Sequence, residues 1–401
     1  AITAAKQAPD AKFLLFTGDF VETGTEQNSE WEWEQWFEVS MKPLLSRMAL
    51  APTDGNHDDT PNLNYTYHFN TDKAFNETAT VKPQFDGITY SFVYGDALFM
   101  VYSHQDFWRG SYSYANGTST YLSNDVANWF RDQVEKYPDT KWRIAAVHKN
   151  LFTGSGHQTD EDGALFRATL LPVFQELNID FVIQGHDHIY EVMGPINNTT
   201  KTIVPGSVTN VELVSPDSNK NPKGQQGGTF NVKDGTLYFV NGTCGRKRYY
   251  PYTQDEMEAG FDKHKVEGYW DLFTGKYGQP GAPAFSEISV SSSEIEVKTY
   301  TSDANAQATL FDTFKIVKNG NTGIEENKQS AKLYPTYAKD KINTTESDII
   351  RVNAIDLTGK IYPLPFDNQH IDVSNLTDGI YVVQIFTNEK TRSERIVKTS
   401  R

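Results

Sequence analysis

Short, mostly apolar runs alternate with amphipathic segments over the first half of the chain. The runs at residues 13–16, 143–147 and 179–183 are each followed by a glycine or a polar residue, a pattern that predicts buried strands. Two more strands, 89–94 and 97–103, are predicted on either side of the turn dipeptide Gly95-Asp96.

Helical periodicity lies between these strands. Ser29 and Glu32 have the spacing of a capping box, which predicts the start of a helix. The apolar residues that follow at helical spacing are Trp33, Trp36, Phe37, Met41, Leu44, Leu45 and Met48. We interpret the tryptophans as core residues rather than as a ligand platform. Further helices are predicted from about Ser123 and over about 163–178, the second bent at Pro172.

The pattern becomes rich in strands after residue 236, with strands predicted at 236–241, within 286–301 and at 309–317. Helices between the early strands, followed by hairpins, predict an α/β domain over residues 1–318. Segments 201–233 and 251–283 are rich in turn-forming residues, and we expect long loops there. A turn-rich linker at 319–330 and a small all-β sandwich domain at 331–401 complete the predicted organisation.

Side chains that bind metals follow the predicted strands. They occur in four motifs, which are Gly18-Asp19, Gly55-Asn56-His57-Asp58, Val147-His148 and Gly185-His186-Asp187-His188. Ligands at the carboxyl ends of strands converge on one edge of a sheet. One carboxylate, one carboxamide and three imidazoles suit a pair of ions about 3.5–4 Å apart, which can attack phosphate esters.

In combination and order, these motifs resemble those of the calcineurin-like metallophosphoesterases, and most of all the purple acid phosphatase branch, over residues 1–318. The resemblance implies a two-sheet β-sandwich flanked by helices and a site for two metal ions, drawn from Fe, Zn, Mn and Mg. It implies that Asp19 bridges the two ions. It also implies that Asn56, His148 and His186 bind one ion, and that His188 helps to bind the other.

The same resemblance assigns residues to the substrate. His57 would donate a proton or a hydrogen bond to the leaving oxygen, and Asp58 or another carboxylate would orient it. His157 matches a position where plant members of the branch place a substrate-binding histidine. The alternative for His157 is a solvated histidine in a loop rich in Gly and Ser.

Two departures from the family pattern change the expectation. No Asp-x-His or Asp-x-Gly motif precedes Asp19, and residues 1–8 have the pattern of a helix end, so we expect that an N-terminal segment is missing. Glu22 stands where the purple enzymes have the tyrosine that gives their colour, so a purple Fe(III) site is not expected. Two roles stay open for Glu22, which are a hydrogen-bond partner of His57 and a metal ligand.

Other polar residues have ordinary explanations. His104 fits a hydrogen-bonded structural histidine better than a site residue. The run Arg246-Lys247-Arg248 fits a solvated loop better than a phosphate contact, and both alternatives stay open.

Composition narrows the class of protein. A net charge of −15 argues against tight nonspecific binding of nucleic acid, which needs a basic surface. No apolar run approaches the roughly 18–20 residues that cross a membrane as a helix. The single cysteine, Cys244, excludes a disulfide within the chain.

The C-terminal segment has a separate signature. It begins at Leu333-Tyr334-Pro335, has a turn at Thr358-Gly359-Lys360, continues with Gly379-Ile380-Tyr381, and has a basic end at 395–398. It resembles the sorting domain of type IX secretion cargo, without the usual second proline. The implied partners of residues 331–401 are the translocon and an outer-membrane carrier. Such tails are usually removed after export, so its presence indicates an unprocessed form. A generic carbohydrate-binding or adhesion domain is the alternative.

Together these features predict an exported metallophosphoesterase, secreted or held at the cell surface after crossing the outer membrane of a Gram-negative bacterium. The predicted reaction is hydrolysis of small-molecule phosphate monoesters by a metal-bound hydroxide. One alternative is a phosphodiesterase acting on nucleotides or lipid head groups. The other is a non-catalytic secreted binding protein with a vestigial metal site.

Overall fold

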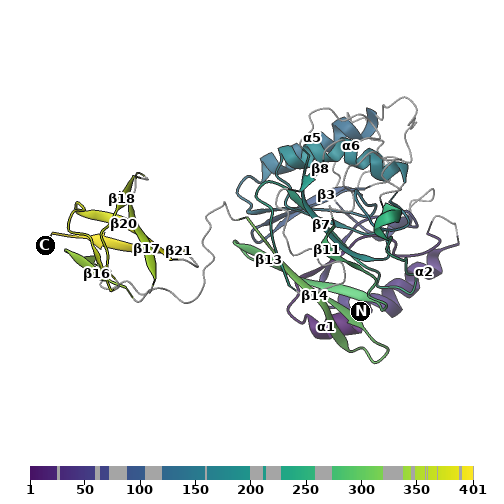
Figure 1. Cartoon of the computed structure of the whole chain (residues 1–401). Helices are drawn as coiled ribbons and strands as arrows, with labels where there is room; N and C mark the ends of the chain where they lie inside the picture. Colours follow the sequence, from purple (N-terminus) through teal and green to yellow (C-terminus); the bar gives the residue numbers. More distant parts are fainter. Residues whose placement is uncertain are drawn as a thin grey trace. The chain divides into compact units, whose positions relative to one another are not determined.

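The computed structural model describes residues 1–24, 28–58, 64–71, 88–103, 120–158, 160–198, 211–213, 227–257, 273–318, 337–344, 348–356, 358, 360–367, 369–387 and 391–400. The chain forms two compact units, Ala1–Asn319 and Gly320–Arg401 (Figure 1). Each unit is described by itself.

The first unit mixes helices and strands. Its helices are α1 (Ile2–Gln7), α2 (Glu30–Glu34), the π-helix η1 (Gln35–Met41), α3 (Lys42–Leu45), α4 (Asn64–His68), α5 (Thr120–Lys136) and α6 (Glu161–Glu176). Its strands are β1 (Phe13–Phe16), β2 (Ala49–Pro52), β3 (Tyr90–Tyr94), β4 (Ala97–Val101), β5 (Trp142–Val147), β6 (Phe181–Gln184), β7 (Tyr190–Asn198), β8 (Val211–Leu213), β9 (Thr229–Asn231), β10 (Thr236–Asn241), β11 (Phe273–Gly278), β12 (Ala284–Val290), β13 (Glu294–Ser302) and β14 (Ala308–Val317).

These strands form three sheets. The largest has the order β11-β7-β10-β6-β5-β4-β3, and β8 pairs with β7. Its centre is parallel, because β4 pairs with β5, β5 with β6, and β6 with β10 in parallel. A second sheet has the order β12-β13-β14-β9, and β1 and β2 form a parallel pair of their own.

The large sheet buries both of its faces. Alternate residues of β4 point to opposite sides, so that Leu98 and Met100 pack in one cluster while Ala97 and Phe99 pack in another. The first cluster lies beneath α5 and α6, which run side by side over that face (Figure 1). The second contains residues of β13, β14 and β9, and residues of β12 and Phe13 of β1 pack against it. This arrangement confirms the predicted α/β architecture of sheets packed face to face and flanked by helices.

The helix predicted after Ser29 differs from the structure in its details. It is α-helical over α2, widens into η1, and returns to α-helix in α3. Ser29 makes no side-chain capping hydrogen bond, and the carboxylate of Glu32 bonds to the backbone of Glu22 and Thr23 instead. The prediction of a capping box at Ser29 and Glu32 was therefore wrong. Trp33 and Trp36 are buried in the core beneath this helix, as predicted.

The segments predicted as long loops contain strands. Segment 201–233 includes β8 and β9, and segment 251–283 includes β11. Alternation is hard to recognise in β11, because its sequence is Phe-Thr-Gly-Lys-Tyr-Gly. Lys276 of this strand is buried, and its Nζ forms an ion pair with Oδ1 of Asp312 in β14 at 2.5 Å. His104 lies outside the described residues.

The second unit is built from strands. They are β15 (Tyr337–Ala338), β16 (Lys341–Asn343), β17 (Ile349–Asp356), β18 (Ile361–Pro363), β19 (His370–Asp372), β20 (Gly379–Thr387) and β21 (Thr391–Lys398). A five-stranded sheet, β15-β21-β20-β17-β18, and the pair β16-β19 share one apolar core that includes Ile342, Ile371 and Val383. The all-β fold predicted for this segment is confirmed.

Among the described residues, no helix has the length and apolar character that crossing a membrane would require.

Candidate metal centre

Two parallel strand pairs deliver the candidate ligands to one place. In the large sheet, Val147 of β5 lies opposite Gln184 of β6, so His148 and His186 leave the sheet at the same edge. In the small pair, Phe16 of β1 lies opposite Pro52 of β2, and Asp19 and Asn56 follow a few residues later. Parallel strands place their carboxyl ends together, which is why residues far apart in sequence meet here.

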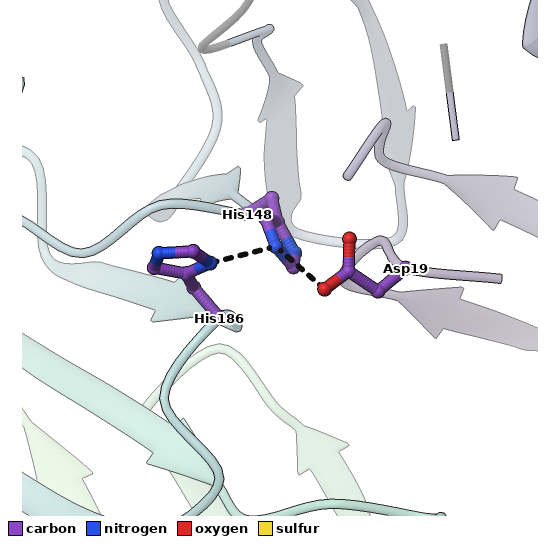
Figure 2. A group of neighbouring side chains, drawn as sticks. All are labelled: Asp19, His148 and His186. Carbon is purple, nitrogen blue, oxygen red and sulfur yellow. Dashed lines mark hydrogen bonds and ion pairs between the residues drawn. The ribbon is translucent and has the colours of Figure 1, made fainter. Parts of the chain in front are cut away.

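The Nε2 atom of His148 is the centre of the arrangement. It lies 3.2 Å from Oδ2 of Asp19, 3.1 Å from Oδ1 of Asn56 and 3.2 Å from Nδ1 of His186. Figure 2 shows the imidazole of His148 between the carboxylate of Asp19 and the ring of His186. The ligand atoms of Asp19, His148 and His186 all lie within 4.8 Å of one another. Donors around an ion with bonds of about 2.0–2.2 Å stand about 3 to 3.5 Å apart, so this donor set fits a metal ion.

Hydrogen bonds to carbonyl groups fix two of the imidazoles. Nδ1 of His148 lies 2.6 Å from the carbonyl oxygen of Thr17, and Nδ1 of His188 lies 3.0 Å from that of Lys247. A carbonyl oxygen only accepts, so Nδ1 carries the proton in both rings and Nε2 is left as the coordinating atom. Outer partners of this kind orient the histidines that bind metals.

The backbone at the site adopts conformations that most residues avoid. Asp19 and His186 have positive φ values of 53° and 62°. Such backbone costs energy and concentrates at functional sites. Gly18, at φ 89°, brings the chain against His148, and a Cβ atom there would stand 2.6 Å from Nδ1 of that ring. The glycine beside Asp19 is therefore needed for the close approach of the two ligands.

His57 lies beside Asp19 and is held by the backbone. Its amide donates to Oδ1 of Asp19 at 3.1 Å, and Nδ1 of its ring donates to the carbonyl oxygen of Glu22 at 2.7 Å. The partner of the ring is thus the main chain of Glu22, and the side chain of Glu22 is exposed.

Asp58 has a different role from the expected one. Its Oδ1 accepts from the amides of Phe20 and Val21 at 2.7 and 3.2 Å, and its Oδ2 accepts from the amide of Gly55 at 2.7 Å. The buried carboxylate therefore ties the loop after Asp19 to the loop that carries Asn56. The expectation that Asp58 orients the ring of His57 is corrected, because the carbonyl of Glu22 does so.

Glu32 supports this region from α2. Its Oε2 accepts from the amides of Glu22 and Thr23 at 2.8 and 2.9 Å, and its Oε1 accepts from the hydroxyl of Thr23 at 2.6 Å. The carboxylate that the sequence assigned to a capping box thus holds the carbonyl that positions His57.

His157 lies against the metal centre. Its ring centroid is 3.8 Å from that of His186, and its Nδ1 is 2.7 Å from Oδ2 of Asp160. The ring of Tyr249 is 5.6 Å from that of His157 and stacks on His188 at 4.6 Å. His157 is thus ordered by contacts on two sides.

Burial and nearby charges shift the pKa values of the neighbouring carboxyl groups of Asp19 and Asp58 in opposite directions. Burial opposes charge on Asp19, but His148 and His57 hold its pKa below the usual range. Burial and the charge of Asp19 raise the pKa of Asp58 to about 8. Burial also lowers the pKa of the His188 imidazole, which favours the neutral form that binds metals. Asp19 is therefore the anionic carboxylate of this site.

The structure brings together Asp19, Asn56, His148 and His186, and the charge of Asp19 acts on the nearby His188. Sequence reasoning missed Asp160 and Tyr249 and gave Glu32 the wrong role. The spacing of His157 and Asp160 could have indicated their ion pair. No sequence signal indicates Tyr249.

Comparison with known families agrees with this geometry. Residues 1–190 match the calcineurin-like phosphoesterase family, and residues 332–399 match the secretion system C-terminal sorting domain. The first unit therefore carries a calcineurin-like phosphoesterase domain, and the second carries a sorting domain of the type IX system, which marks a protein for export. All five candidate ligands lie within residues 1–190.

Individual relatives are more distant. Uncharacterized proteins from two strains of Mycobacterium tuberculosis are 26% identical over 217 residues, which is 51% of this chain and 40% of theirs. Purple acid phosphatase 5 of Arabidopsis thaliana is 26% identical over 176 residues, which is 43% of this chain and 34% of its own. A purple acid phosphatase structure from yellow lupin seeds has 16% identity and a TM-score of 0.47, covering 79% of this chain and 49% of its own. The chain spans less than half the length of each of these proteins.

Proposed function

We propose that the first unit is a metal-dependent hydrolase of phosphate monoesters. The observation that carries this proposal is the approach of Asp19, Asn56 and His186 to one nitrogen of His148, at 3.1–3.2 Å. A carboxylate, a carboxamide and imidazoles together form a donor set for Zn, Mn, Fe or Mg rather than for a soft metal.

In this proposal two metal ions occupy the site. Asp19, Asn56, His148 and His186 would hold one ion, and Asp19 and His188 would contribute to holding the other. When bound, such ions polarise the phosphoryl group and supply a nucleophile at neutral pH. The protein's own contribution is to fix the ligands, and the carbonyl groups of Thr17 and Lys247 do so for His148 and His188.

Two further histidines act on the substrate. His57, as the imidazolium, donates a proton or a hydrogen bond to the leaving oxygen from Nε2, because its Nδ1–H is engaged by the carbonyl oxygen of Glu22. His157 contacts the phosphate, since its ring packs on that of His186 and is held by Asp160.

The sorting domain directs this activity out of the cell. We propose that residues 331–401 engage the type IX translocon and an outer-membrane carrier, so that the protein is secreted or displayed by a Gram-negative bacterium. The match of residues 332–399 to the sorting-domain family supports this assignment.

The decisive experiment compares p-nitrophenyl phosphate with bis(p-nitrophenyl) phosphate after loading the protein with each metal in turn. We expect a higher kcat/KM for the monoester with at least one of the metals. A preference for the diester would replace the proposal with a phosphodiesterase. Metal binding with no turnover of either ester would replace it with a non-catalytic binding protein.

A further inference from the structure

The chain that leaves β10 returns to the edge of the sheet where the candidate ligands lie. β10 runs parallel to β6, with Val240 opposite Gln184, so residues after Asn241 emerge beside the turn that carries His186. The cationic run 246–248 belongs to this segment. Arg246 and Lys247 are exposed, as a solvated loop predicts, and the position of the run beside the site keeps the alternative of a contact with substrate open.

Three contacts anchor the segment to His188. The carbonyl oxygen of Lys247 accepts from Nδ1 of His188 at 3.0 Å. The ring of Tyr249 lies parallel to that of His188, with 4.6 Å between centroids and 8° between planes. Nε2 of Gln279 donates to the carbonyl oxygens of His188 and Tyr249, both at 2.7 Å. The backbone of the segment is thus held in place at the rim of the site.

The side chain of Lys247 brings positive charge to this rim. The residue is exposed, and its Nζ lies 5.7 Å from the centre of the Tyr249 ring that stacks on His188. Arg246 beside it is also exposed. In the part of the chain that the structure describes, neither side chain forms an ion pair with a carboxylate. Because the whole chain has a net charge of −15, this rim is locally opposite in sign to the rest of the protein.

We propose that Lys247, with Arg246 beside it, binds a second anionic group of the substrate. The preferred substrates are then phosphate monoesters that carry a carboxylate or another phosphate next to the ester. This inference rests on the proposed function, because it takes the scissile phosphate to be held by the centre that includes His188. An ammonium group is a compact charge with three donors, so it accepts either kind of anion.

The test uses two esters that differ in one charge. Glycerol 2-phosphate and 2-phosphoglycerate share the ester position, and a carboxylate in the second replaces a hydroxymethyl group in the first. We expect the metal-loaded wild-type protein to favour 2-phosphoglycerate in kcat/KM by about fivefold, the size of one well-placed exposed ion pair. Lys247→Gln should bring this ratio to about one, and Lys247→Arg should retain it. Higher salt should reduce the preference in the wild type.

A matched control separates the local contact from a change in overall charge. Lys233 is exposed before β10, at the opposite end of that strand, and Lys233→Gln removes the same charge there. This control should keep the wild-type ratio. Hydrolysis of both esters with no preference, or an equal loss for both in Lys247→Gln, would overturn the inference and leave the proposed function standing. A metal-loaded wild type that hydrolyses no phosphate ester removes the proposed function, and this inference with it.

Discussion

Nε2 of His148 lies 3.2 Å from Oδ2 of Asp19, although the two residues follow strands of different sheets. His148 directly follows β5 of the large sheet, whereas Asp19 follows β1 of the two-stranded pair. Phe13 of β1 packs against the apolar cluster on one face of the large sheet, so packing between separate sheets holds the two strands together. The candidate centre therefore depends on how the two layers pack, and not on one loop.

Asp19→Asn should lose metal and activity together. The substitution keeps the size of the side chain but removes the anionic charge that His148 and His57 face. Losing an outer partner of a metal ligand costs about 10–100-fold in metal affinity, so losing a ligand should cost at least about 100-fold. Elemental mass spectrometry and phosphate release measure the two effects. Unchanged metal content would refute the role of Asp19 as a ligand, and circular dichroism would confirm that the fold is retained.

His57→Ala should reduce turnover far more than metal content. Positioned proton transfer contributes about 10²–10⁴-fold, and His57 is the histidine that the Glu22 carbonyl positions beside Asp19. The loss should be large for an alkyl phosphate and small for p-nitrophenyl phosphate, because nitrophenolate leaves without a proton. Equal losses for both esters would argue that His57 does not act on the leaving group.

Asp58→Ala should destabilise the first unit. It leaves the amides of Phe20, Val21 and Gly55 buried without their acceptor. Each such group costs about 1–3 kcal/mol, so we expect a loss of about 3 kcal/mol or more in the free energy of unfolding. Urea denaturation measures it. Asp234→Ala, at an exposed position, is the control. If Asp58→Ala loses no more unfolding free energy than this control, the result would contradict the account.

Lys276→Met should cost about 3–5 kcal/mol of unfolding free energy, because it leaves the charge of Asp312 buried opposite an apolar side chain. The double variant Lys276→Met with Asp312→Leu should be more stable than this single variant, since no charge is then buried. A double-mutant cycle from denaturation curves measures the coupling. A double variant less stable than the single one would show that the charges themselves are not the cause.

Deletion of residues 325–401 should abolish export and leave hydrolysis intact. The two compact units have separate cores, so the first should fold without the second. Activity in cell fractions and in the medium measures both effects. Loss of soluble, active protein inside the cell would mean that the tail is needed for folding.

Sequence patterns predicted the strands that position the site. The apolar runs that end before His148 and Gly185 form β5 and β6. Short continuous apolar runs are typical of strands that are buried on both faces of a sheet. The ligand motifs were recognisable because each joins a strand end to a metal-binding side chain. The burial of Trp33 and Trp36 also followed from periodicity alone.

Other features depend on tertiary contacts that no local pattern contains. Glu32 has the right spacing for a capping box, yet its carboxylate bonds to the amides of Glu22 and Thr23, which the fold brings near it. The sequence pattern did not predict the strand that contains Lys276. A lysine is rarely buried without a charged partner, and here the partner is Asp312, which lies in another sheet. The orientation of His57 by a backbone carbonyl leaves no trace in the sequence.

The most direct test of the central claim is phosphate release from p-nitrophenyl phosphate before and after chelation, with metal per chain counted by elemental mass spectrometry. The account predicts about two ions per active chain, loss of hydrolysis when they are removed, and recovery when metal is returned. Hydrolysis that survives complete removal of metal, or a folded and metal-loaded protein that releases no phosphate, would contradict it.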